Sequence, residues 1–278
     1  MKRIDRYLRR LIPAVPVLSR MPAMRVLDFV DWLTGLPFKE AKGLPPNRYR
    51  IRIGVGNRVL FNQFSYSYQG VDFMLYAFAQ GMAGLSSHIV DIGCGCGRYA
   101  MPLARFRVGP HQFAGRYVGV DVDSEMIAWC RSNFPADTFS FHHADIHNKV
   151  YNPAGALTTE EYALPVEDSS QDLVFSNSLY THLLEDGLRH YLTEAYRVLR
   201  PGGWTVGSVF CPERMNGSLG GRWTFPHLVG NAAVETLAYP EAAVGYREAF
   251  LTTLCQSVGF RQVDMVWGPE QSLLQCRK

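Results

Sequence analysis

The sequence predicts an α/β fold built around a mainly parallel β-sheet, and three observations lead to this prediction. Short apolar runs with the character of strands alternate with helical stretches along most of the chain. Several of these runs end in aspartate or are followed by glycine, as expected where ligands bind at the carboxyl ends of parallel strands. The 278 residues are 47% hydrophobic and 19% charged, which suits a globular protein with a full core.

The first predicted strand and the turn after it carry the strongest signal in the chain. Residues 88–92, His-Ile-Val-Asp-Ile, indicate a buried strand, and glycines occupy alternate positions of the turn 93–97 before a helix expected over Tyr99–Phe106. A dinucleotide fingerprint would place its third glycine at position 98, where this chain has arginine. The pattern therefore favours a nucleoside ligand without a pyrophosphate, held by close backbone approach and by free N–H groups at the helix start.

The next two predicted strands also end in carboxylates. The run 116–121 ends in Asp121, a residue suited to accept hydrogen bonds from two neighbouring ribose hydroxyls. The stretch 123–126 is typical of a capped helix start, with Met126 available to pack on a flat ring. A third run, 138–145, again ends in aspartate. Because the carboxyl ends of parallel strands meet at one edge of a sheet, these side chains are expected to lie together.

The second half of the chain continues the alternation of strands and helices. A fourth apolar run precedes a helical stretch, a Pro-Gly-Gly turn that is an ordinary helix stop, and a fifth strand. One more helix and two strands end the chain. In order, the expected elements are strand 172–177, helix Glu185–Leu199, turn Arg200–Gly203, strand Trp204–Phe210, helix Tyr246–Val258, and strands Gln262–Trp267 and Gln271–Cys276.

Taken in this order, residues 85–210 resemble the class I S-adenosylmethionine-dependent methyltransferases. The glycine turn is similar to the first motif of that family, and Val-Leu-Arg-Pro-Gly-Gly at 198–203 is similar to its pattern before the fifth strand. The resemblance implies a Rossmann-like sheet of seven mostly parallel strands with helices on both faces. It also implies S-adenosylmethionine as cofactor and S-adenosylhomocysteine as product. The cofactor-binding residues that it implies are Asp91, Gly93, Gly95, Gly97, Asp121, Val122, Met126, Asp145, Ile146 and Ser176.

Two segments outside the motifs are candidates for binding the acceptor. We expect residues 1–84 to form an N-terminal extension and lid over the active site. Residues 85–278 would form the methyltransferase domain, with a substrate-side insertion at about 211–245. Residues 40–84 resemble the N-terminal extension of a bacterial subgroup often found with glycan and natural-product genes. They would either shield the reacting sulfonium from water or form an extra hairpin over the sheet edge. The acceptor-binding candidates are Tyr66, Tyr68, Tyr180 and Trp223.

The implied cofactor decides the chemistry. Methyl transfer is an in-line displacement that needs a desolvated, oriented acceptor, and a hydroxyl acceptor also needs a base. His182, just after the fourth strand, is the candidate, because a histidine pKa of about 6.5 allows it to accept a proton at neutral pH. The alternative is a structural histidine at a helix start.

The turn at 176–179, Ser-Asn-Ser-Leu, differs from that of amino-methylating DNA enzymes and lacks the carboxylates of magnesium-dependent catechol-type enzymes. We therefore expect metal-independent methyl transfer to a hydroxyl of a small molecule or glycan. N-methylation of an amine, or a non-catalytic partner protein with this fold, stays open.

Charge and cysteine content indicate the surroundings of the protein. The net charge is +3, but residues 1–20 alone carry +5. The first dozen residues can form a basic amphipathic helix that either contacts an anionic membrane or packs on its own domain. The charge is not spread over the catalytic core, so no nucleic-acid partner is expected. Six cysteines without a disulfide or zinc pattern indicate reduced thiols, and we expect a cytoplasmic protein with a membrane contact, if any, through residues 1–12.

Overall fold

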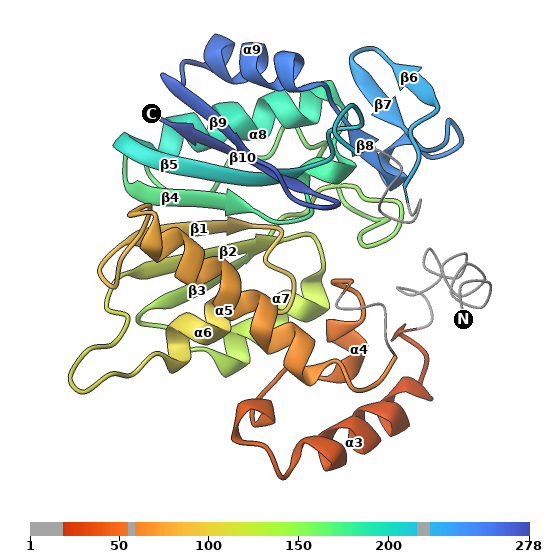
Figure 1. Cartoon of the computed structure of the whole chain (residues 1–278). Coiled ribbons are helices and arrows are strands. Elements are labelled where there is room, and N and C mark those ends of the chain that lie inside the picture. The colour runs from red at the N-terminus through yellow and green to blue at the C-terminus, as the bar shows by residue number, and fades with distance from the viewer. Residues whose placement is uncertain (1–18, 55–58, 216–222) are drawn as a thin grey trace.

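A computed structural model describes residues 19–54, 59–215 and 223–278 (Figure 1). Its centre is a seven-stranded sheet with the order β3-β2-β1-β4-β5-β10-β9. Strands β1 to β5 run parallel, and β10 is antiparallel to both of its neighbours, β5 and β9. This is the predicted seven-stranded, mostly parallel sheet. The strands are β1 (His88–Ile92), β2 (Arg116–Asp121), β3 (Phe139–His143), β4 (Gln171–Ser176), β5 (Leu199–Val209), β9 (Gln262–Val266) and β10 (Ser272–Arg277).

Helices cover both faces of this sheet. Alternation along the strands sends neighbouring side chains to opposite faces: Val90 of β1 packs in the core beneath α8 and α9, and Ile89 in the core beneath α5, α6 and α7. The second strand divides its side chains in the same way, so each face buries a continuous apolar layer. The covering helices are α5 (Gln63–Ala79), α6 (Ala100–Arg105), α7 (Ser124–Asn133), α8 (Glu185–Val198) and α9 (Glu248–Val258).

The N-terminal segment is helical. For residues 40–84 the sequence analysis left open a shield over the active site or an extra hairpin, and the described residues of this range contain helices and no hairpin. The N-terminal segment contains α3 (Met24–Gly35), a 3-10 turn η2 (Lys39–Ala41) and α4 (Asn47–Arg50), before α5. Helix α5 packs on the sheet domain: its Phe73 ring lies against the rings of Tyr99 and Phe175, with centroids 5.2 and 4.7 Å away. Helix α5 therefore belongs to the core of the sheet domain, although the predicted boundary at residue 84 assigns it to the N-terminal extension.

The segment between β5 and α9 forms a small unit of its own. It has three antiparallel strands, β6 (His227–Val229), β7 (Ala232–Val234) and β8 (Val244–Gly245), with the 3-10 turn η4 (Pro240–Ala242) before β8. This unit adjoins η3 (Tyr180–His182), the 3-10 turn that follows β4. The predicted basic helix over residues 1–12 lies outside the described residues. Within the part of the chain that is described, no helix is long and apolar enough to span a membrane.

Candidate active site

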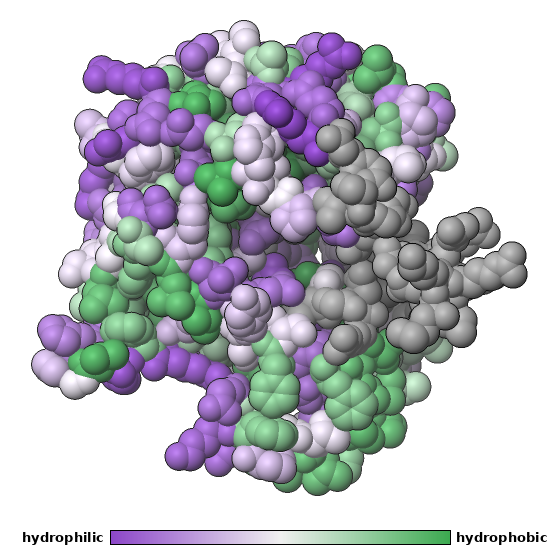
Figure 2. Space-filling view, in the orientation of Figure 1, coloured by the Kyte–Doolittle hydropathy of each residue, from purple (hydrophilic) through white to green (hydrophobic). Residues whose placement is uncertain are grey.

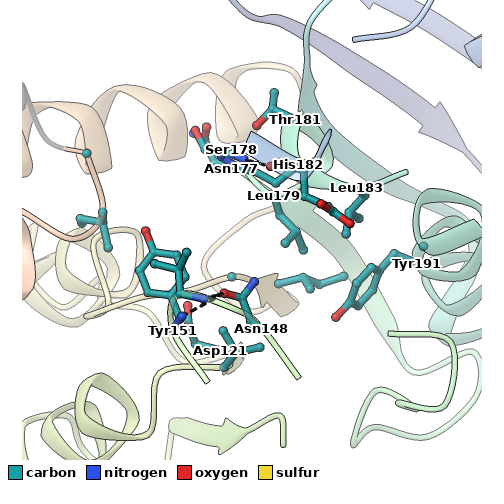
Figure 3. A pocket seen from close by; sticks show the side chains of 18 of the residues that line it. Asp121, Asn148, Tyr151, Asn177, Ser178, Leu179, Thr181, His182, Leu183 and Tyr191 are labelled. Carbon is teal, nitrogen blue, oxygen red and sulfur yellow. Dashed lines mark hydrogen bonds between the residues drawn. The ribbon is translucent and has the colours of Figure 1, made fainter. Parts of the chain in front are cut away.

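A cavity of about 2120 Å³ opens at the carboxyl ends of the parallel strands. Its walls come from the glycine turn after β1, the residues that follow β2, β3 and β4, one side of α5, and the insertion between β5 and α9. Figure 3 shows His182 and Asn177, from the segment after β4, across this space from Asp121 and Tyr151. The cavity therefore lies where the order of the strands predicts a ligand site.

The glycine turn needs its glycines for conformation and for space. Gly93, Gly95 and Gly97 have φ of 80°, 54° and 79°, in the left-handed region that other residues avoid. A Cβ at Gly95 would lie 2.6 Å from the Cγ2 of Ile53, and one at Gly97 would lie 2.8 Å from the Phe134 ring. Gly93 lines the cavity, whereas Gly95 and Gly97 do not and instead lie against Ile53 and Phe134.

Asp121 fastens the glycine turn to the end of β2. One carboxylate oxygen accepts the Gly95 N–H at 2.7 Å, and the other accepts the Asp123 N–H at 2.8 Å. Each oxygen keeps lone-pair capacity for a further donor, as two ribose hydroxyls would require. Burial in the cavity wall raises the pKa of Asp121 to about 6, although both backbone bonds act in the opposite direction. At neutral pH the carboxylate is ionised and its position is fixed.

Asp91 lies behind the glycine turn and does not line the cavity. Its side chain is fully buried, and the Tyr117 hydroxyl donates a hydrogen bond to its Oδ2. Among the described residues, Oδ1 has no hydrogen-bond partner. Burial raises the pKa of Asp91 to about 7. Its place beneath the turn suits a supporting role for the backbone that meets the ligand.

The other predicted cofactor residues divide into two groups. Val122, Met126 and Ile146 line the cavity, as expected. Asp145 does not: it is exposed and accepts a hydrogen bond from the Asn152 amide at 3.1 Å. Ser176 is buried beneath the wall, and the neighbouring Asn177 takes the place at the surface of the cavity. The strand-end pattern located the wall correctly but could not decide which side chain of each strand end faces inward.

Arg52 joins the N-terminal segment to the start of α7. Its buried guanidinium donates to Asp123 at 2.8 Å and pairs with Glu125 at 2.6 Å. Asp123 is also the N-cap of α7, where it accepts the N–H groups of Glu125 and Met126. This contact holds Arg52, Ile53 and Gly54 in the cavity wall. No motif in the sequence signals a pairing between residues so far apart.

His182 is the predicted base, and it faces the cavity. Its Nδ1 lies 2.8 Å from the Glu241 carbonyl oxygen in η4. Because a carbonyl can only accept, Nδ1 carries the proton in this contact and a neutral ring leaves a lone pair on Nε2. The ring is accessible from the cavity, yet the surrounding protein lowers the pKa of His182 from its usual 6.5, against the opposing effect of the carbonyls of Glu241 and Ala242. His182 is therefore neutral at pH 7.

Three of the four predicted acceptor-binding side chains lie elsewhere. Tyr66 is buried and donates to the Cys96 carbonyl at 2.9 Å, and Tyr68 is 68% exposed on the outer side of α5. Tyr180 is buried against Gly207, whose Cβ would come within 2.2 Å of the tyrosine ring. Only Trp223 lines the cavity. These tyrosines were chosen for their aromatic character alone, and nothing else in the sequence distinguishes a tyrosine that contacts a ligand from one that does not.

The structure adds several polar residues that the sequence analysis missed. The Asn177 amide donates to the Tyr99 hydroxyl, and Arg98 donates to Gln69 of α5 at 2.6 Å with its guanidinium 4.9 Å above the Tyr99 ring. All four line the cavity. These four residues form the cavity wall between α5 and the end of β4. The aromatic residues of α5 did not predict that a polar residue of this helix, Gln69, would line the cavity.

Nowhere in the three described ranges do three or more His, Cys, Asp or Glu side chains gather as a metal would require. His143, the last residue of β3, has its Nε2 3.1 Å from the Val122 carbonyl oxygen. That contact explains its position without a metal ion.

Comparisons with known proteins agree with this fold and site. Residues 90–207 match the family model described as a methyltransferase domain. Among curated proteins, a malonyl-[acyl-carrier protein] O-methyltransferase of Pectobacterium atrosepticum is 31% identical over 130 residues, which cover 46% of this chain and 40% of that protein. The chain spans less than half the length of the curated relatives that it matches.

Solved structures show the same fold at low identity. An S-adenosylmethionine-dependent methyltransferase from Mesorhizobium loti is 17% identical with a TM-score of 0.50, over 73% of this chain and 97% of that one. Another, from Archaeoglobus fulgidus, is 15% identical with a TM-score of 0.50, over 75% and 93%. The sheet domain has the class I methyltransferase fold, and residues 90–207 match the methyltransferase-domain model.

Proposed function

We propose, from the methyltransferase domain at residues 90–207, that this chain transfers the methyl group of S-adenosylmethionine to a hydroxyl of a small molecule or glycan, without a metal ion. The observation that carries this proposal is the arrangement of the cavity. The glycine turn and the Asp121 carboxylate lie on one side, and a neutral histidine held through its Nδ1 lies on the other. Both sides belong to one continuous space.

The cofactor side fits S-adenosylmethionine. Gly93 allows the ligand to approach the backbone closely, Asp121 offers an ionised carboxylate to the ribose hydroxyls, and Met126 offers an apolar surface to the adenine ring. When bound, the cofactor would supply a sulfonium carbon from which the methyl group can be displaced. The residues of the chain then need only to hold the acceptor in line with it and to exclude water.

The rest of the cavity has room for a sizeable acceptor. The whole cavity, cofactor side included, has a volume of about 2120 Å³, which exceeds the roughly 300–1,000 Å³ of most small-molecule pockets. Trp223 packs against Phe210, with ring centroids 5.4 Å apart, and both rings line the cavity together with Tyr239. Aromatic faces with polar groups between them suit a polyhydroxylated molecule such as a glycan.

His182 would remove the acceptor proton. With Nδ1–H held by the Glu241 carbonyl, the free Nε2 can accept the hydroxyl proton as the new carbon–oxygen bond forms. The curated O-methyltransferase to which residues of this chain are 31% identical is named for transfer to oxygen, which supports oxygen as the acceptor atom. Transfer to an alcohol would leave an ether and a protonated histidine.

An amine acceptor is the second candidate, because carboxylate side chains are frequent in the cavity wall. An ammonium group would be attracted by them before it loses a proton and accepts the methyl group. They are Asp72, Glu160, Asp186, Glu235, Glu241 and Glu270.

Two measurements test the proposal in turn. Calorimetry with S-adenosylhomocysteine should give one site per chain; no heat and no thermal shift at millimolar ligand would favour a non-catalytic partner protein. Transfer of labelled methyl groups to panels of glycans, alcohols and amines then identifies the acceptor. Acid-stable label on a hydroxyl supports O-methylation, label on nitrogen supports the amine alternative, and label found only on protein or nucleic acid would contradict both.

A further inference from the structure

Helix α3 has its polar side inward and its apolar side outward. Asp31 is buried, at 3% exposure, whereas Phe29 and Trp32 are 60% and 58% exposed, and Val26 is 64% exposed. A helix on the surface of a globular domain normally shows the opposite pattern, with its apolar stripe toward the core. The sequence of α3 is thus amphipathic, but the apolar side has no partner within the described residues.

Ion pairs to α4 fix α3 in this orientation. Arg48 pairs with Asp28, and the buried Arg50 pairs with Asp31. Asp31 also accepts a hydrogen bond from the Gln63 amide at 2.8 Å, at the start of α5. Because these acids are satisfied on the inner side, rotating α3 to bury its rings would leave charges without partners.

The apolar surface continues from α3 onto the start of α5. Phe38 contacts Phe64 edge to face, with ring centroids 5.0 Å apart. Phe61 has φ of 60°, a strained conformation for a bulky residue, and its side chain is 59% exposed. We name as the docking face the exposed residues Val26, Phe29, Trp32, Leu33, Leu36, Phe38, Phe61, Phe64 and Tyr68.

This concentration is peculiar to one end of the molecule. Of 18 large hydrophobic side chains exposed in the described residues, 13 lie between Met21 and Leu75. Figure 2 shows hydrophobic side chains gathered over the lower end of the molecule, where Figure 1 places α3. An exposed apolar area of this extent marks an interaction site in a folded protein.

Charge indicates which partner fits. Residues 1–84 contain thirteen Lys and Arg against five Asp and Glu, although the whole chain has a net charge of only +3. Pairing of Asp28 with Arg48 and of Asp31 with Arg50 leaves eleven Lys and Arg against three Asp and Glu in this segment. A second copy would bring the same excess of positive charge against this one in a symmetric dimer, which disfavours self-association. An anionic surface is favoured by the same charge.

We propose that the docking face binds the surface of an anionic lipid bilayer. Phenylalanine, leucine and valine side chains would enter the boundary between headgroups and acyl chains, while Trp32 and Tyr68 suit the headgroup level. Arginine and lysine of the N-terminal region would contact lipid phosphates. This proposal concerns the N-terminal helices alone and does not depend on the reaction in the cavity.

Vesicle sedimentation with the full chain tests the proposal. The protein should sediment with vesicles that contain phosphatidylglycerol and much less with vesicles of phosphatidylcholine alone. The double variant Phe29→Ser/Trp32→Ser should weaken binding by more than about tenfold, because each buried ring contributes free energy of transfer. The matched control Leu228→Ser/Leu237→Ser removes two equally exposed apolar side chains from the insertion and should bind as the wild type does.

A second measurement locates the contact. Bromine-labelled lipids should quench the tryptophan fluorescence of the wild type more than that of Trp32→Phe, a variant that keeps the apolar face. Three outcomes would overturn the proposal: no sedimentation with either vesicle, sedimentation that the double variant leaves unchanged, or a stable dimer in lipid-free solution that the double variant dissolves. The last would assign the docking face to a second copy of the chain.

Discussion

On the cofactor side of the cavity, the glycine turn and Asp121 lie within 35 residues of the start of β1, and the Gly95 N–H of the turn donates to the Asp121 carboxylate. The acceptor side is assembled differently, because His182 depends on the Glu241 carbonyl, 59 residues further along the chain. The first wall is set by local backbone geometry. The second is set by where an insertion packs.

This difference has a consequence for how each wall responds to mutation. Asp121 has both oxygens held by N–H groups that do not change when a neighbouring side chain is replaced. His182 is oriented by η4, whose position rests on the small sheet of the insertion. Substitutions on the acceptor side should therefore affect turnover, and those on the cofactor side should affect affinity for S-adenosylhomocysteine.

The largest expected effect is on turnover, and it tests the acceptor side. His182→Ala removes the only base proposed and should lower kcat by about 10²–10⁴-fold, with little change in the affinity for S-adenosylhomocysteine. His147→Ala is the matched control, because His147 also lines the cavity, but on the side after β3. Single-turnover methyl-transfer assays on both variants measure the rate constant of the reaction. If the His182 variant lost cofactor affinity instead, the histidine would be structural and the division between the walls would fail.

The next effect is on affinity, and it tests the cofactor side. Asp121→Ala removes a charged acceptor worth about 1.5–3 kcal/mol per hydrogen bond and should weaken S-adenosylhomocysteine binding at least tenfold. Asp121→Asn keeps one carbonyl oxygen for the backbone and should lose less. Calorimetry gives both dissociation constants, and thermal unfolding checks that the fold persists. If both variants bound S-adenosylhomocysteine as tightly as the wild type does, the ribose would have to lie away from Asp121.

A pH series separates the two walls within one wild-type protein. Burial raises the pKa of Asp121 to about 6, so a falling pH protonates the carboxyl through that value and weakens cofactor binding. The pKa of His182 is lowered from 6.5, so kcat at saturating cofactor should stay level through pH 6.5 and fall only below it, by about tenfold per pH unit. A kcat that already falls at pH 7 would assign the titration to another group.

The same contrast explains how much could be predicted from the sequence. The strands themselves, the glycine turn, the helix cap at Asp123 and Asp121 at the end of β2 follow from short, local patterns, and the structure has all of them. The inward position of His182 was predicted from its place after β4, although its partner in η4 was not. Contacts such as that of Arg52 with Asp123 join residues 71 positions apart and leave no local pattern.

Aromatic residues were the weakest part of the sequence analysis, for a physical reason. A tyrosine supplies apolar area and one hydroxyl whether it meets a ligand, supports a turn or faces solvent. Tyr66 and Tyr68 are two residues apart on α5, so the helix turns them to different sides, one into the core and one into solvent. Only the packing of α5 on the glycine turn decides which role each takes.

The smallest expected effect is on stability, and it compares these two tyrosines directly. Tyr66→Phe removes the hydroxyl that donates to the buried Cys96 carbonyl and should lower the free energy of unfolding by about 1–3 kcal/mol, since the carbonyl loses its partner. Tyr68→Phe removes an exposed hydroxyl of the same chemistry and should change the free energy by less than about 0.5 kcal/mol. Neither variant should alter the KM for the acceptor, because neither side chain lines the cavity.

Urea unfolding and methyl-transfer kinetics on both variants measure these quantities. A raised acceptor KM in Tyr66→Phe at unchanged stability would mean that Tyr66 contacts the acceptor, as the sequence analysis expected. Its bond to the Cys96 carbonyl would then not be its main role.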